Sequence, residues 1–175
     1  LLFIFLATGT DATIALIGGA DITANFRPGT MAISIGMLLS ALAMTWHLVH
    51  FHYVKFNKES MYEVSKKIIL LCIPLLLSAQ FIAGILNEAL DLTDTNQELF
   101  ISMSHNIFGV LSIAIVVPIL EEVLFRGAIE GHLLRKGWSP KWAILVSALI
   151  FGIIHGNPAQ IPFAFLIGLL FGWLY

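Results

Sequence analysis

The stretch that decides the fold is residues 116–127, which read V-V-P-I-L-E-E-V-L-F-R-G and set two glutamates and an arginine inside an apolar helical run. On insertion scales, each charged side chain at the centre of a helix in lipid costs about 2.5 to 3.5 kcal/mol. Something must offset that cost. Residues four apart share one face of an α-helix, so we expect Glu122 to pair with Arg126, and Arg126 with Glu130.

Glu121 stands apart from this ladder. It lies about 100° round the helix from Glu122, on a face that it shares with Phe125, Ala128 and His132. That face offers no cation at neutral pH unless the histidine is protonated. A carboxylate held in low dielectric without a fixed counter-ion suits a group that takes up and releases a proton, so we expect Glu121 to transfer protons.

The composition indicates a membrane protein. Hydrophobic residues make up 58% of the 175 residues and charged residues 11%, against about 25% charged residues in a typical soluble domain. The formal net charge of -2 gives no basic excess for nucleic acid, so no nucleic-acid partner is predicted. Cys72, a single cysteine in an apolar run, excludes a disulfide framework. We therefore predict an integral membrane protein that lies in the lipid bilayer.

Apolar stretches long enough to cross a bilayer recur along the chain, separated by short polar connections. The predicted fold is all-α, a multi-pass transmembrane helical bundle with about six helices in this stretch of chain. The chain stops inside an apolar helix at Tyr175, so we expect a fragment with at least one more helix after it. The predicted spans are residues 1–19, 31–53, 68–90, from Ser104 or His105 through the glutamate pair, 142–155 and 160–175.

Lys and Arg are distributed unevenly over the connections. They occur at 54–67, where the pattern also supports a short surface helix, and at 135–141, whereas 91–103 is acidic and carries none. By the positive-inside rule, loops 54–67 and 135–141 are predicted to be cytoplasmic and 91–103 to lie outside. Arg27, in the predicted loop at 21–29, is the one exception. The predicted location is the cell membrane, in a multi-pass arrangement.

The turn R-K-G-W-S-P-K at 135–141 joins the charged helix to the next one, with a glycine as helix stop and a Ser-Pro pair as the next start. Glu121 lies fourteen residues before this turn and His155 fourteen residues after it, so each is about 21 Å from the turn at 1.5 Å per residue. Antiparallel helices packed about 8 to 10 Å apart would let both side chains face a common water within the membrane. The estimate assumes that the helix continues through Gly127 and Gly131.

Each of these residues also has a purely structural interpretation. Glu122, Arg126 and Glu130 could form an ion-pair ladder that only holds helices together. His155 alone would more often be a satisfied interior histidine. The depth match favours a functional role, as does the Gly-Asn-Pro break after it, which leaves backbone groups without partners near the imidazole. Phe151 is predicted to be a packing residue, as are the G-x-x-x-G glycines near the end of the chain.

The two charged motifs resemble those of a known family. E-E-V-L-F-R at 121–126 is similar to the E-E-x-x-x-R motif, and F-G-I-I-H at 151–155 to the F-x-x-x-H motif, of the CPBP intramembrane proteases. That family includes the CAAX prenyl endopeptidases and the bacterial Abi proteins, some linked to bacteriocin immunity or peptide maturation. The resemblance covers residues 107–175. The predicted domains are accordingly N-terminal membrane helices at 1–103 and a protease-like core at 104–175, incomplete at its C-terminus.

The resemblance implies an intramembrane endopeptidase that hydrolyses a peptide bond in a membrane peptide or protein substrate. Glu121 would be the general base that activates water, and Glu122 and Arg126 would support its geometry. His155 would orient the water or stabilise the oxyanion. In one respect the chain departs from the family, which has a further H-x-x-x-N or similar motif on a later helix. This chain ends at Tyr175 before reaching that motif.

The sequence commits to no cofactor and leaves a divalent metal such as zinc open. One glutamate and one histidine are too few for a stable zinc site, which takes three protein ligands and a water. The later helix could supply the remainder, as in a metalloprotease. The alternative is a metal-free mechanism in which Glu121 and His155 handle the proton and the fold supplies oxyanion donors.

Two hypotheses from other classes compete with the protease. His47, His50 and His52 are similar to the histidine boxes of membrane di-iron enzymes, but those need many more ligands than the six histidines of this chain. Interfacial packing near the headgroups is the simpler explanation of the cluster. The other hypothesis is a non-enzymatic membrane immunity or transport protein, whose buried charges bind a partner or an ion. Glu121→Gln separates the classes, because a protease loses cleavage whereas a binding-type immunity protein keeps its protection.

Overall fold

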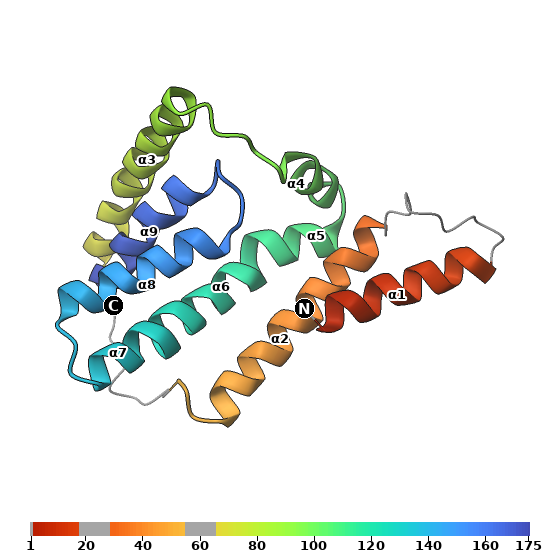
Figure 1. Ribbon diagram of the computed structural model, residues 1–175, viewed down its shortest axis with the longest axis horizontal. Helices are drawn as coiled ribbons and strands as arrows, with labels where there is room; N and C mark the ends of the chain where they lie inside the picture. Colours follow the sequence, from red (N-terminus) through yellow and green to blue (C-terminus); the bar gives the residue numbers. More distant parts are fainter. Residues whose placement is uncertain (1, 18–28, 55–65) are drawn as a thin grey trace. The chain divides into compact units, whose positions relative to one another are not determined.

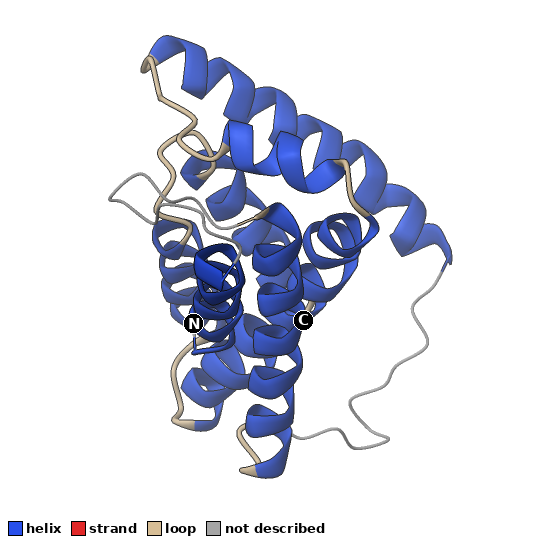
Figure 2. Ribbon diagram, turned by 90° about the vertical axis from the view of Figure 1, so that its right-hand side faces the viewer, coloured by secondary structure: helices blue, strands red, loops and turns tan. Residues whose placement is uncertain are grey.

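The described part of the chain is all-helical. The computed structural model describes residues 2–17, 29–54 and 66–175, and within these ranges every regular element is a helix and no strand occurs (Figures 1 and 2). This confirms the predicted all-α fold. The predicted loop at 21–29 and the connection at 54–67, with its surface helix, fall almost wholly outside the described residues.

Among the described residues, three helices are long and apolar enough to cross a bilayer, which takes about 20 residues. They are α2 (Thr30–His50, 21 residues), α3 (Lys66–Ala89, 24 residues) and the helical run Ile107–Arg135 of 29 residues. Large apolar side chains on α3, such as Leu77 and Phe81, are exposed, as expected of a surface that lipid covers. The chain is therefore a multi-pass membrane protein.

The other predicted spans form shorter helices. α1 is Leu2–Ile17, while α8 (Pro140–Ile154) and α9 (Ile161–Leu174) hold 15 and 14 residues. At 1.5 Å per residue, α8 is about 22 Å long, less than the roughly 30 Å of a hydrocarbon core. All three helices lie where the sequence predicts them.

The chain divides into two compact units. The first comprises residues 1–51 and 97–122, that is α1, α2, α4 (Gln97–Ser104), α5 (Ile107–Leu111), η2 (Ser112–Val116) and α6 (Val117–Glu122). In this unit α2 packs against both α1 and the run from α5 to α6. Fully buried serines allow the close approach, because Ser112 Oγ lies 3.1 Å from Ser34 O on α2. The predicted domains, membrane helices at 1–103 and a protease-like core at 104–175, are a functional division and stay a prediction.

The fourth predicted span begins later than expected. α4 ends at Ser104, and the long helix starts at Ile107 after Asn106, whose side chain accepts a hydrogen bond from Gly109 N at 2.7 Å. An asparagine at this position caps the free N–H groups of the first turn. The prediction that Ser104 or His105 opens the span is therefore wrong, because the capping asparagine follows both residues.

The second unit comprises residues 52–96 and 123–175, with α3, η3 (Val123–Glu130), α7 (Gly131–Arg135), α8 and α9. Its centre is the hairpin of α8 and α9, drawn in blue in Figure 1, with α3 against α9 and η3 against α8. Two glycines let α9 approach α8 and η3 closely. A Cβ on Gly168 would lie 2.9 Å from Ala148 Cα, and one on Gly172 would lie 2.8 Å from Glu130 Oε2. The close packing expected of these glycines is thus present.

The turn between α7 and α8 has the predicted stop and start signals. Gly137 adopts a φ of +85°, a left-handed conformation that favours glycine, and Trp138 N and Gly137 N donate back to Leu133 O and Leu134 O. These two bonds form the Schellman pattern that ends a helix. Pro140 then opens α8, where its missing N–H costs nothing.

Gly168→Ala is expected to destabilise the second unit by about 1 to 3 kcal/mol, because the added Cβ meets the Ala148 backbone in a packed interior. Gly84→Ala is the matched control. Gly84 lies inside α3 with nothing within 4 Å of its Cβ position, so alanine there should be neutral or stabilise by about 0.5 to 1 kcal/mol. Thermal unfolding of both variants in detergent measures the difference. Equal melting temperatures would contradict the packing described.

Candidate active site

The motif residues lie on a helix that changes its winding. Helical structure continues from Ile107 to Arg135 through Gly127 and Gly131, so the continuity that the sequence analysis assumed is confirmed. The η3 stretch, however, is π-helical, with i to i+5 hydrogen bonds and a wider turn. Each residue of such a stretch rises less along the axis than in an α-helix. The estimate of about 21 Å from Glu121 to the basic turn, made for an α-helix throughout, is therefore too long, while the predicted pairing of Arg126 with Glu122 and Glu130 stays a prediction.

The two glutamates of the first motif are the last residues of α6, immediately before the π-helical stretch. Glu121 and Glu122 are both half-buried. Each takes part in at least one polar or electrostatic interaction, so the prediction that Glu121 is a carboxylate without a partner is wrong. Its candidate role rests instead on its place in the motif, within an apolar helix.

Arg126 is almost fully buried, with 3% of its surface exposed. Its Nη1 donates to Ser147 Oγ on α8 at 3.3 Å, and Ser147 Oγ in turn donates to Phe125 O at 3.1 Å. The guanidinium carbon lies 5.5 Å from the centre of the Phe151 ring, within the range of a cation–π interaction. Arg126 thus also holds η3 to α8, a role that was not predicted because only carboxylates on its own helix were considered as partners.

Phe151 connects the two motifs. Its ring centre lies 4.8 Å from that of Phe125 and 4.9 Å from that of His155, and the rings meet edge-on. Arg126 lies over the same ring. The prediction that Phe151 is a packing residue is therefore incomplete, since it contacts the arginine of one motif and the histidine of the other. The spacing of four residues between Phe151 and His155 could have predicted this contact, because it puts both rings on one helix face.

His155 is the C-terminal cap of α8 and is half-buried. Its Nδ1 lies 2.7 Å from Phe151 O. A carbonyl oxygen can only accept, so Nδ1 carries the hydrogen and Nε2 of the neutral ring presents a lone pair. Nε2 can therefore accept a hydrogen bond from water. Gly156 follows with a φ of +61°, which confirms the predicted end of the helix directly after the histidine.

The described residues contain no group of three or more His, Cys, Asp or Glu side chains that could hold a metal ion. A zinc site takes three protein ligands and a water, so these residues do not fit such a site by themselves. His155 alone has one feature of a metal-binding histidine, because its Nδ1 is bound to a backbone carbonyl.

Two further histidines, His47 and His50, lie at the end of α2 and contact aromatic rings. His50 stacks on Trp46 with 4.8 Å between ring centres, and His47 meets Phe51 at 4.6 Å. All four side chains are exposed. Amphipathic rings at the end of a membrane helix are typical of the layer at the lipid headgroups, which agrees with the interfacial packing considered for this cluster.

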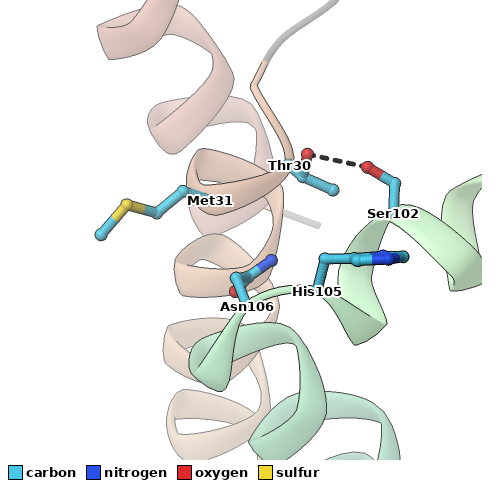
Figure 3. Close-up of a pocket in the computed structure, with 5 residues that line it drawn as sticks. All are labelled: Thr30, Met31, Ser102, His105 and Asn106. Carbon is cyan, nitrogen blue, oxygen red and sulfur yellow. Dashed lines mark hydrogen bonds between the residues drawn. The ribbon is translucent and has the colours of Figure 1, made fainter.

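A pocket of about 310 Å³ opens on the first unit, lined by Thr30, Met31, Ser102, His105 and Asn106 (Figure 3). The hydroxyls of Thr30 and Ser102 lie 3.0 Å apart across it. None of the predicted site residues lines this pocket, so it is separate from the two motifs.

Ser147→Ala is expected to lower the free energy of unfolding by about 1 to 3 kcal/mol, because it removes a buried hydrogen-bond partner of Arg126. Ser78→Ala is the matched control. The exposed Ser78 Oγ bonds only within its own helix, to Pro74 O, so its loss should change stability by at most about 0.5 kcal/mol. Unfolding in detergent micelles measures both variants. If Ser147→Ala costs no more than the control, the bond to Arg126 does not stabilise the fold.

The fold and these side chains define a multi-pass helical membrane protein with ionisable groups inside its helices. Residues 103–175 match the model of a family described as type II CAAX prenyl endopeptidase Rce1-like. This match confirms the resemblance of the two motifs to the CAAX prenyl endopeptidases, and a likeness to that family implies an intramembrane protease. Comparisons of the chain with curated proteins and with solved structures found no match.

Proposed function

We propose that this protein is an intramembrane endopeptidase that hydrolyses a peptide bond with a water molecule activated by Glu121. The family domain spans both motifs, from the glutamate pair to the histidine. The observation that supports the proposal most is the ring of Phe151, because Arg126 of the first motif and His155 of the second both contact it. Such a contact is expected if both motifs serve one reaction.

In the proposed reaction, Glu121 takes one proton from the water while the water oxygen attacks the carbonyl carbon of the scissile bond. The second hydrogen stays on the water oxygen and forms a hydrogen bond to Nε2 of His155. Nε2 presents a lone pair because Nδ1 carries the ring hydrogen. The tetrahedral oxyanion then collapses, the C–N bond breaks, and Glu121 returns the proton to the leaving amine. Glu122 supports the position of Glu121, and Arg126 supports the ring of Phe151.

The proposed substrate is a membrane peptide or a segment of a membrane protein. The description of the matched family names a CAAX prenyl endopeptidase, and a peptide at the bilayer is the class we assign to this chain. Peptide maturation and bacteriocin self-immunity are two settings that such cleavage would serve. On the proposed topology, loops 54–67 and 135–141 face the cytoplasm, because they carry most of the Lys and Arg.

The experiment is a cleavage assay with the full-length protein in proteoliposomes and a library of membrane-associated peptides, read by mass spectrometry with and without a chelator. The proposal predicts cleavage by the wild type and its loss in Glu121→Gln. Sensitivity to the chelator would add a metal to the mechanism, and resistance would favour the metal-free form. If Glu121→Gln cleaves as well as the wild type, the proposal is wrong. Cells protected equally by both proteins would favour a non-enzymatic immunity function.

A further inference from the structure

On the predicted topology, the turn that follows His155 lies at the end of α8 far from the cytoplasmic surface, next to the acidic loop at 91–103. The basic turn before α8 belongs at the membrane surface, and α8 is 15 residues long, so its far end is about 22 Å from that surface. The hydrocarbon core is roughly 30 Å thick. Where lipid surrounds it, backbone that is not helical must have its polar groups satisfied within the protein. The hydrogen bonds of this turn therefore determine where His155 points.

Asn157 is the fully buried residue of the turn, with 0% of its surface exposed. Its Nδ2 donates to Asp94 Oδ1 at 2.7 Å, and its Oδ1 accepts from Thr95 N at 3.2 Å. Its backbone carbonyl accepts from Gln160 N at 2.9 Å and from Ile161 N at 3.2 Å, which starts α9. Asn157 thus anchors the turn to the loop after α3 and also sets the beginning of the next helix.

The residues that hold the turn lie before the family domain. Asp94 Oδ1 also accepts from Asn96 N at 3.0 Å, which fixes the carboxylate in its own loop. Farther along the turn, Asn87 Nδ2 near the end of α3 donates to Ala159 O at 2.8 Å. Asp94, Asn96 and Asn87 all precede residue 103, where the family match begins. The end of α3 and the loop after it therefore support the turn that carries the histidine.

We propose that Asn157 is a positioning residue for His155. Through its bond to Asp94 it fixes the turn, and with the turn the direction of the imidazole Nε2. The inference rests on the proposed function, in which Nε2 orients the water. Only Gly156 separates the two residues, so a displacement of Asn157 reaches the cap of α8 directly. Loss of the anchor lets this helix end fray and lets Nδ1 leave Phe151 O.

The test exploits the polarity of the bond between Asn157 and Asp94. Asn157→Asp sets two carboxylates against each other, and we expect kcat for peptide cleavage to fall about 10- to 100-fold while KM stays within about twofold. Asp94→Asn keeps an acceptor oxygen, so kcat should stay within about threefold of the wild type. The double variant Asp94→Asn/Asn157→Asp lets an amide at position 94 donate to a carboxylate at position 157. It should recover most of the lost kcat.

Asn87→Ala is the matched control, because it removes the side-chain bond of the turn that does not involve Asn157. It should lower the melting temperature while kcat stays within about threefold of the wild type. Two results would overturn the inference. One is a wild-type kcat for Asn157→Asp, and the other is a double variant no more active than Asn157→Asp.

A second measurement separates the inference from the proposed function. Nitrogen-15 NMR of the histidine rings, on full-length protein in nanodiscs, should show His155 as the single Nδ1–H tautomer in the wild type. In Asn157→Asp the same ring should show a mixture of tautomers. If the wild type cleaves no peptide while its fold is intact, the proposed function fails and these spectra alone decide the inference. An unchanged His155 spectrum in Asn157→Asp overturns it.

Discussion

Glu121→Gln is expected to lower kcat for peptide cleavage by about 10²- to 10⁴-fold, the range that a positioned general base contributes. The amide of glutamine has nearly the size of the carboxylate but cannot accept a proton from water. The half-buried position at the end of α6 should tolerate the exchange, so the variant should keep its fold. Initial rates at saturating substrate in proteoliposomes measure the effect, and thermal unfolding verifies that the protein is folded.

Two glutamates serve as controls for this result. Glu98 is exposed in the first turn of α4, outside both motifs, and Glu98→Gln should cleave at the wild-type rate. Glu122→Gln removes a carboxylate that supports the base. Its decrease in kcat should therefore lie between the decreases of Glu98→Gln and Glu121→Gln. If Glu122→Gln is the most impaired of the three, the second glutamate is the base and the assignment to Glu121 is wrong.

His155→Asn is expected to lower kcat by about 100-fold, whereas His155→Gln should lose clearly less. The side-chain amide of asparagine reaches the position of the imidazole Nδ1, and that of glutamine reaches the position of Nε2. In the structure, Nδ1 is occupied by its bond to Phe151 O, which leaves Nε2 for the water. Glutamine can therefore place an acceptor oxygen where the reaction needs one, and asparagine cannot.

The order of the two histidine variants is the informative quantity. Alanine at the same position gives the baseline in which neither nitrogen is replaced. If His155→Asn is the more active variant, the contact to Phe151 O matters more than a group at Nε2. In that case His155 holds the end of α8 and does not orient the water.

The features of the fold that could be predicted are those written in short stretches of sequence. The hydrophobic runs predicted α2 and α3, because a helix whose exposed face contacts lipid is recognised by its length and apolar composition alone. Gly137 and Pro140 marked the helix stop and start, because each residue restricts its own backbone wherever it occurs. The two motifs were likewise readable, since their spacing of four residues puts side chains on one helix face.

The features that escaped prediction depend on residues far apart in the chain. The bond from Asn157 to Asp94 spans 63 residues, and no periodicity connects the two positions. Ser147 reads as one more small residue in an apolar helix, yet it receives a hydrogen bond from Arg126. The π-helical winding of η3 is also invisible to an analysis that assumes 3.6 residues per turn. The distance from Glu121 to the basic turn was overestimated for this reason.

The central claim is that Glu121 and His155 act on the same water. The most direct test is crosslinking of Glu121→Cys with His155→Cys in membranes, in a Cys72→Ala background that removes the native thiol. A bifunctional thiol reagent with a reach of about 8 to 10 Å matches the spacing of packed helices. Glu121→Cys with Ile154→Cys is the control pair, since Ile154 is 64% exposed and lies on another face of α8. We predict an intramolecular crosslink for positions 121 and 155 at a yield well above the control. A yield equal to the control in folded protein would contradict the claim.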